Sequence, residues 1–190
     1  AVVISAVTAD VIAHYFEGDQ RTFLTPDYAL NSPWELLLYT LMGMLAALAA
    51  VAFSRLLYFS EDMWNLIRIP EPTKPILGGI MLGVLGIFSF QIEGFPRVFG
   101  VGYNTIESSL FSQLTLQMTF GLLLLKLLAT TLTLGSGGSR GIFAPSLFMG
   151  AMLGGTFGHI AHSIFPETVA PSGAYALVGM AAFFGGVAHA

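Results

Sequence analysis

The sequence predicts an all-α integral membrane protein, and three observations carry that prediction. Hydrophobic residues make up 55% of the 190 positions, whereas charged residues make up only 9%. A soluble domain carries roughly a quarter charged residues. The mean hydropathy is strongly positive, at +0.77. Several apolar stretches also approach the roughly 20 residues that a membrane-spanning helix needs.

Six apolar stretches are the candidates for its helices. The three clearest are residues 36–53, whose pattern continues over 56–59, residues 114–134 and residues 142–165. The three shorter ones are residues 1–16, 75–90 and 173–190. Short, glycine-interrupted segments such as 75–90 are typical of tilted or broken helices around a transport site.

Three polar connectors, at residues 18–33, 55–74 and 91–112, lie between the first four of these stretches along the chain. Proline, glycine and charged residues gather in them, and the third connector is expected to contain a short helix that dips into the bilayer. Lys and Arg number three in the second connector and one in each of the others. By the positive-inside rule the second connector is expected to face the cytoplasm and the other two to face outward.

The ends of the chain and its composition limit what the protein is expected to be. The chain begins at Ala1 without a signal-peptide pattern and stops within the apolar run 185–190. We therefore expect residues 1–190 to be a fragment of one transmembrane domain, truncated at both ends. The net charge of −4 is too weak to indicate nucleic acid, and the absence of cysteine excludes a disulfide framework.

Glycine spacing predicts how the helices pack. Gly150, Gly154 and Gly158 fall four residues apart, and Gly79 and Gly83 repeat that spacing. Small residues at i and i+4 let two membrane helices approach closely. Both sets are therefore expected at helix–helix contacts.

The most informative stretch is Gly141-Ile142-Phe143-Ala144-Pro145, which follows a run of small residues. Gly141 allows a sharp approach of the chain, and proline is tolerated in the first turn of a helix. The first amides of a helix have no acceptor within it and lie at the positive end of its dipole, so they attract an anion. Gly141 and the amides of Ile142, Phe143 and Ala144 are therefore the predicted anion-binding residues.

Gly135-Ser136-Gly137 and the following 141–147 stretch resemble the GxFxP signature of the CLC chloride channel and transporter family. Residues 18–19, 77–86, 102–106 and 173–190 are similar to that family in the same order. The resemblance implies the helices that the family letters I to O, the last one truncated, as part of a CLC-type transport domain. It implies that the amides of Ile142 and Phe143 bind the central chloride.

The resemblance also implies properties of the whole protein. These are a homodimer with one pore per subunit, the helix beginning at Ala1 near the dimer interface, and chloride as the transported ligand with no other cofactor. We expect an integral, multi-pass protein of the cell membrane. The family's gating glutamate, site serine and closing tyrosine would lie outside this chain, so the sequence leaves a channel and a chloride/proton antiporter equally open. The fragment is expected to transport nothing by itself.

Charges in or near the apolar stretches are further candidates, because charge is costly inside a membrane. Lys126 is expected to pair with a carboxylate on another helix, or else to add positive potential to an anion path. Glu35 is expected at an interface near a helix end. Arg140 departs from the glycine that is usual before the motif, and it is expected either to reach a water-filled vestibule or to strengthen the local positive potential.

Two other kinds of function are alternatives to transport. One is an intramembrane hydrolase with Ser136 or Ser139 as nucleophile and a histidine such as His159 as base; the other is a structural membrane subunit that transports nothing. His159 and His162 are spaced i, i+3, a geometry that can hold a metal. No further ligands are evident, so a packed or interfacial role is expected, with no metal site and no enzyme activity.

Overall fold

The structure, a computed structural model, describes residues 2–18, 23–28, 32–93, 98–138, 141–166 and 168–189. These residues form α-helices and one short 3-10 turn, with no strand in the described ranges, so the all-α prediction is confirmed. The elements in order are α1 Val2–Glu17, α2 Glu35–Leu66, η1 Glu71–Thr73, α3 Lys74–Glu93, α4 Tyr103–Leu110, α5 Leu116–Gly135, α6 Phe143–Ile164 and α7 Ser172–His189. Each of the six predicted apolar stretches overlaps one of the longer helices, and α4 lies in the third predicted connector.

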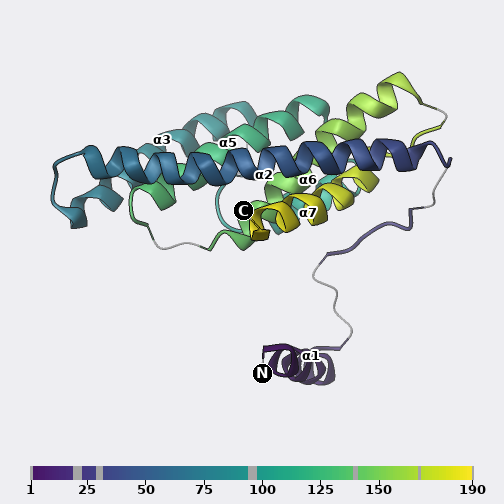
Figure 1. The fold of residues 1–190 in the computed structure, drawn as a ribbon, viewed down its shortest axis with the longest axis horizontal. Coiled ribbons are helices and arrows are strands. Elements are labelled where there is room, and N and C mark those ends of the chain that lie inside the picture. The colour runs from purple at the N-terminus through teal and green to yellow at the C-terminus, as the bar shows by residue number, and fades with distance from the viewer. Residues whose placement is uncertain are drawn as a thin grey trace.

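Helices α2 to α7 pack into one bundle, and α1 lies apart from it (Figure 1). The long helix α2 runs the length of the bundle and contacts α5, α6 and α7. The most extensive contact is between α6 and α7, and α5 packs on another side of α6. Helix α6, which carries the predicted anion site at its start, is therefore surrounded by helices.

Two apolar cores lie against α6, and its side chains contribute to both. Phe148 and Met152 are fully buried in a core shared with α4 and α5. Met149 is fully buried in a second core shared with Phe53 of α2 and Phe183 of α7. Because consecutive residues of α6 point into different cores, a rotation or shift of this helix disturbs both.

The glycine stripe of α6 makes direct contact with the backbone of α7, as predicted. A Cβ added at Gly150 would lie 2.5 Å from the Gly179 carbonyl oxygen, and one at Gly158 would lie 2.7 Å from the Ser172 Cα. A Cβ at Gly154 would overlap the carbonyl oxygen of Tyr175. Membrane helices gain little from the hydrophobic effect when they associate, so such close backbone contact is a main source of their attraction.

The described chain shows no such contact at Gly79 and Gly83. Nothing in the described part of the chain lies within 4 Å of a Cβ built at either position. The glycines of α3 that meet neighbours are Gly78, beside Ser136, and Gly86, beside the Phe99 ring. The spacing was correct for a helix, but it did not identify which face of α3 is covered.

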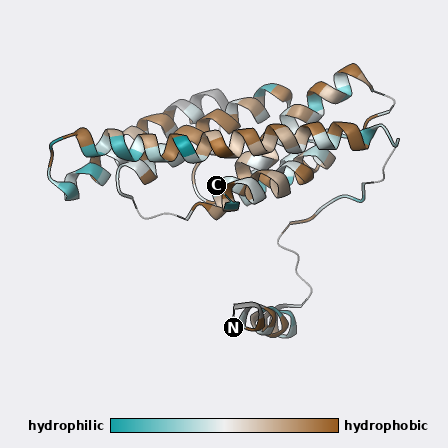
Figure 2. Ribbon diagram, in the orientation of Figure 1, coloured by the Kyte–Doolittle hydropathy of each residue, from teal (hydrophilic) through white to brown (hydrophobic). Residues whose placement is uncertain are grey.

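Three of the described helices are long and apolar enough to cross a membrane, namely Glu35–Leu66, Leu116–Gly135 and Ser172–His189. Hydrophobic residues recur along the helices of the bundle in Figure 2, where the ribbon is coloured by the hydropathy of each residue. The predicted span 142–165 forms the 22-residue helix α6 but is not among these three. Its glycines, hydroxyl residues and histidines lower its hydropathy.

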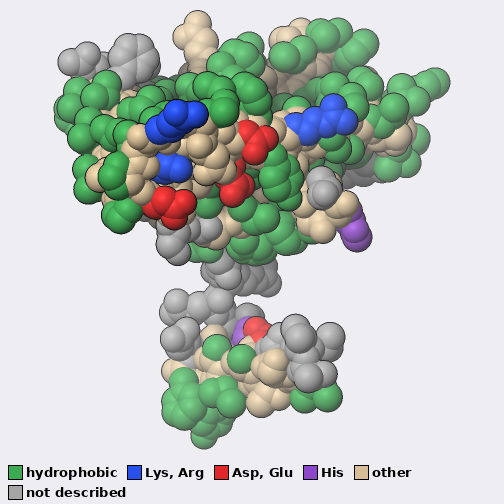
Figure 3. Space-filling view, turned by 60° about the vertical axis from the view of Figure 1, so that its left-hand side comes forward, with side chains coloured by type: hydrophobic (Ala, Val, Ile, Leu, Met, Phe, Trp, Pro, Cys, Tyr) green, Lys and Arg blue, Asp and Glu red, His purple; other side chains and the backbone are tan. Residues whose placement is uncertain are grey.

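Helix α2 extends beyond its predicted end. The segment from 55 was expected to be a connector, but the helix continues to Leu66 because the first proline after it is Pro70. Charged side chains of both signs gather at this end of the bundle (Figure 3). They come from the end of α2, η1 and the start of α3, and they are Arg55, Glu61, Asp62, Arg68, Glu71 and Lys74.

A methyl group on the glycine stripe should separate α6 from α7. We expect Gly154→Ala to cost about 1–3 kcal/mol, because the added Cβ meets backbone atoms that cannot move aside. The thermal unfolding midpoint of the full-length protein in detergent measures this loss. Gly121→Ala on α5 is the matched control, since nothing in the described chain lies within 4 Å of a Cβ there. Equal midpoints for the two variants would contradict close α6–α7 packing.

Candidate anion-binding site

The chain reverses between α5 and α6 through a left-handed glycine. After α5, the amides of Ser136, Gly137 and Gly138 donate to carbonyls of its last turn, at 3.1, 3.0 and 2.9 Å. Gly137 has φ +87°, a conformation that favours glycine. A left-handed turn of the bend therefore falls at Gly137, which sequence analysis did not single out.

The first amides of helix α6 have no hydrogen-bond acceptor within the helix. Its first intrahelical bond runs from the amide of Ser146 to the carbonyl of Ile142, at 3.1 Å. The amides of Phe143 and Ala144 precede that bond, and Pro145 has no N–H. Ile142 occupies the N-cap position, where no side chain caps the helix. The positive end of the α6 dipole is therefore presented through main-chain N–H groups.

The start of α6 is exposed while the residues just behind it are buried. Ile142 is 45% exposed and Phe143 is 53% exposed. Pro145 and Ser146 are buried, and the Ser146 hydroxyl donates to the Ile142 carbonyl at 2.6 Å. This arrangement fixes the first turn from behind and leaves its amide face open.

Helix α7 contributes an aromatic contact to the same turn. The rings of Phe143 and Phe184 meet edge to face, with centroids 4.9 Å apart and an interplanar angle of 80°. This is a favoured geometry for an aromatic pair. The position of the Phe143 ring therefore depends on α7 as well as on α6.

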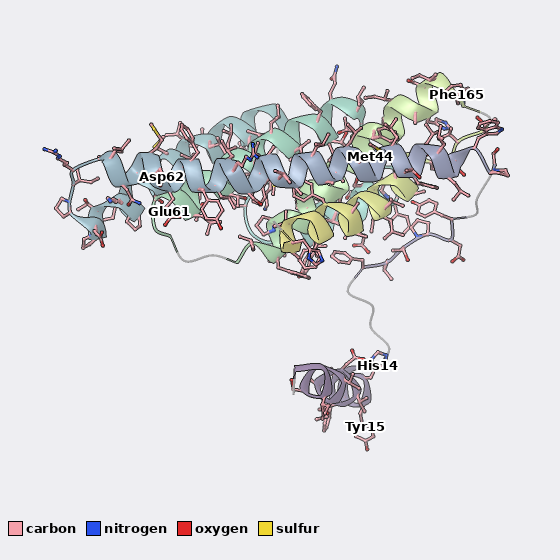
Figure 4. The ribbon with its side chains drawn as sticks, in the orientation of Figure 1. His14, Tyr15, Met44, Glu61, Asp62 and Phe165 are labelled. Atoms are coloured by element: carbon pink, nitrogen blue, oxygen red, sulfur yellow. The ribbon has the colours of Figure 1, made fainter. Side chains whose placement is uncertain are left out.

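A cavity of about 310 Å³ lies beside Ile142. Ser54, Tyr58 and Glu61 of α2 line it, together with Leu57, Leu134, Ile142 and Val187. Figure 4 shows Glu61 next to Asp62 on α2. The hydroxyls of Ser54 and Tyr58 are possible donors to an anion, whereas an ionised Glu61 would oppose one.

Sequence reasoning missed these lining residues because it placed residues 55–74 in a connector. The signal was present in the spacing. Positions 54, 57, 58 and 61 follow the i, i+3, i+4, i+7 pattern, which places them on one face of a helix. A prediction that extended the helix to Pro70 would have found this face.

Ser136 and His159, the described residues proposed as nucleophile and base, have different hydrogen-bond partners. Ser136 is buried and its hydroxyl donates to the Thr133 carbonyl at 3.1 Å, while Ser139 and Arg140 lie outside the described residues. His159 is sixteen residues beyond Phe143 on α6, a rise of about 24 Å. Its Nε2 lies 2.7 Å from the Leu114 carbonyl oxygen, in the packed role that we expected. Within the described ranges, no three His, Asp or Glu side chains group as a metal site would require.

Glu35 lies at the start of α2, near a helix end as expected, and it is buried. Its side chain is only 1% exposed. Its Oε1 accepts a hydrogen bond from the Ala170 amide at 2.5 Å and one from the Tyr175 hydroxyl at 3.5 Å. The carboxylate therefore joins α2 to the segment that leads into α7.

Lys126 of α5 is fully buried. Its Nζ donates to the carbonyls of Val98 and Gly100, at 2.9 and 2.8 Å, and lies 4.7 Å from the centroid of the Phe148 ring. These contacts reach both the segment before α4 and helix α6. The pairing with a carboxylate on another helix remains a prediction.

Comparison with known proteins connects this geometry to one family. Residues 1–190 match the family model described as voltage gated chloride channel. A relative from Ralstonia nicotianae, named as a ClcB-like chloride channel protein, is 32% identical over 188 residues, covering 99% of this chain and 42% of the relative.

Of two further relatives, one is named as a channel and the other as an exchange transporter. Chloride channel protein CLC-f of Arabidopsis thaliana is 32% identical over 197 residues, covering 95% of this chain and 24% of the relative. H(+)/Cl(-) exchange transporter ClcA of Vibrio campbellii is 27% identical over 190 residues, covering 100% of this chain and 40% of the relative. The chain spans less than half the length of each of the three relatives.

The backbone of the bend makes a prediction about its glycines. We expect Gly137→Ala to destabilise the full-length protein by about 1–2 kcal/mol, because an L-residue is strained in the left-handed region. Gly141→Ala should leave stability unchanged, since nothing in the described chain lies within 4 Å of its Cβ position. Thermal unfolding midpoints of the two variants check this, and a loss at Gly141 as large as that at Gly137 would contradict the assignment of the turn.

Proposed function

We propose that the full-length protein carries chloride across a membrane, from the premise that this chain belongs to the voltage gated chloride channel family. The observation that carries the proposal is the exposed start of α6. There, the amides of Phe143 and Ala144 have no acceptor within the helix, and a cavity with two hydroxyl residues adjoins Ile142. In this proposal Gly141, Ile142, Phe143 and Ala144 bind the ion through the main chain.

Main-chain binding suits an ion that must be released after each transport step. A helix N-terminus stabilises an anion by about 0.3–2 kcal/mol. Removing a chloride from water costs far more, so the start of α6 can supply only one part of the coordination. Besides the hydroxyls of Ser54 and Tyr58, further donors would come from parts of the protein outside residues 1–190, which is consistent with relatives more than twice as long.

Several properties of the intact protein belong to the same proposal. Residues 1–190 form part of a single CLC-type transmembrane domain, which functions as a homodimer in the bilayer of the cell membrane. Helix α1, apart from the bundle and with exposed Ile4, Val11 and Phe16, offers apolar surface for lipid or for the second subunit. Chloride is the ligand, and the proposal needs no cofactor and no chemical catalysis.

Substitutions at Phe143 can separate the contribution of its amide to chloride binding from the contribution of its ring. Phe143→Pro removes the N–H and the ring, while Phe143→Leu removes only the ring. Proline disfavours the helical backbone that Ile142 adopts before it, at φ −86° and ψ −15°, so the affinities are compared once both variants show the thermal midpoint of the wild type. Hydrogen bonds to a charged group are worth about 1.5–3 kcal/mol, so we expect chloride to bind the proline variant roughly 10- to 150-fold more weakly than the leucine variant. Isothermal titration of the full-length protein with chloride measures the difference.

Flux through liposomes tests the function itself. The wild-type protein should release chloride from loaded vesicles, and Phe143→Pro should slow that release more than Phe143→Leu does. Chloride release without any effect specific to the proline variant would overturn the site assignment, and a wild-type protein that releases no chloride would overturn the proposed function. Recording proton movement in the same vesicles distinguishes an antiporter, which couples the two ions, from a channel.

A further inference from the structure

The buried cation Lys126 contacts two separate parts of the bundle. Its ammonium donates to the carbonyls of Val98 and Gly100, at 2.9 and 2.8 Å, in the segment that leads into α4. It also lies 4.7 Å from the centroid of the Phe148 ring on α6. A cation over an aromatic face is attracted by the ring quadrupole, and this attraction is strongest where water is excluded. Lys126 and Phe148 are both fully buried.

The Phe148 ring is held close from a second direction by Gly102. A Cβ at Gly102 would lie 2.6 Å from the ring, so the backbone there packs directly on it. Gly100 and Gly102 both adopt left-handed backbone conformations, at φ +67° and +81°. The segment that accepts the hydrogen bonds of Lys126 therefore also packs against the ring that Lys126 faces.

Phe148 lies close to the proposed anion site along the same helix. It follows Phe143 by five residues, which corresponds to about 7.5 Å along the helix axis. The helix between them is rigid, since Pro145 and Ser146 are buried and Ser146 bonds back to Ile142. A displacement of Phe148 along the axis is thus passed to the amides at the start of α6.

We propose that Lys126 is a positioning residue for the anion site: its ammonium joins the Val98 and Gly100 carbonyls to the Phe148 ring and so sets where the first turn of α6 lies. This inference rests on the proposed function. Lys126 acts through Phe148 and does not touch the ion. An apolar residue of the same length would fill the space but would leave the two carbonyls without this donor and the ring without its cation.

Three single variants of the full-length protein test the proposal. Lys126→Met keeps the apolar stem and removes the charge, and we expect chloride binding, measured by isothermal titration, to weaken about tenfold because the site amides shift. Lys126→Arg keeps a cation that can face the ring and should retain most of the affinity. Thr130→Val is the matched control. Thr130 is fully buried one turn further along α5, its hydroxyl has no hydrogen-bond partner among the described residues, and its isosteric replacement should change nothing.

Phe148→Leu separates positioning from a direct effect of the positive charge. This variant keeps Lys126 and its charge but removes the ring. If Lys126 acts through the ring, Phe148→Leu should weaken chloride binding as Lys126→Met does. The double variant should then bind chloride no more weakly than either single variant. The ratio of chloride to nitrate affinity should also change in these variants, because displaced amides no longer match the size and shape of each anion as they do in the wild type.

Each result either supports or overturns the inference. Normal affinity and selectivity in Lys126→Met, or additive losses in the double variant, would overturn it, and so would normal chloride binding in Phe148→Leu. A lowered thermal midpoint with unchanged anion selectivity would show a role in stability alone. If Lys126→Met does not fold, Lys126→Arg and Phe148→Leu still decide between these outcomes. If the wild-type protein transports chloride but Lys126→Met binds chloride normally, the result contradicts this inference alone. If the wild-type protein transports no chloride, the result contradicts the proposed function.

Discussion

The close contact between α6 and α7 is the constraint on which the rest of the structure depends. Gly150 meets Gly179, Gly154 meets Tyr175, and Gly158 meets Ser172, so the two helices run antiparallel with their backbones touching. Lipid offers little hydrophobic drive for helix association, and small residues replace it with direct backbone packing. Continued by two turns toward the start of α6, the same register brings Phe184 to Phe143. The glycine stripe therefore determines where the exposed turn of α6 lies relative to α7.

Among the described residues two charged side chains are buried, and each contacts this pair of helices: Lys126 faces Phe148 of α6, and Glu35 bonds to Tyr175 of α7. Charge in a low-dielectric interior is costly unless it is paired or hydrogen-bonded. Lys126 meets that requirement with two carbonyls and an aromatic ring that belong to other elements. Glu35 meets it with the Ala170 amide and the Tyr175 hydroxyl. Each charge thereby connects segments that the chain itself keeps far apart, and each would be expensive to move.

The sequence predicted the helices well because the signals for them are local. Apolar length located the helices, and the small-residue run before Gly141 located the bend. Local signals failed where a distant partner decides the outcome. Glu35 is buried because of an amide 135 residues away, and no pattern around it indicates that contact. Gly79 and Gly83 have helical spacing, but only the tertiary arrangement shows that α3 turns that face away from its neighbours in the described chain.

A site made of main-chain amides changes which residues matter for function. N–H donors carried by the backbone are the same in every residue except proline, so most side-chain changes in the first turn leave the donors in place. What those donors cannot tolerate is movement, because an anion site loses affinity when its donors shift by a fraction of a bond length. The groups that hold α6 in place lie in the glycine stripe, in the two cores and around Phe148. Packing residues that never approach the ion are therefore expected to decide how well it binds.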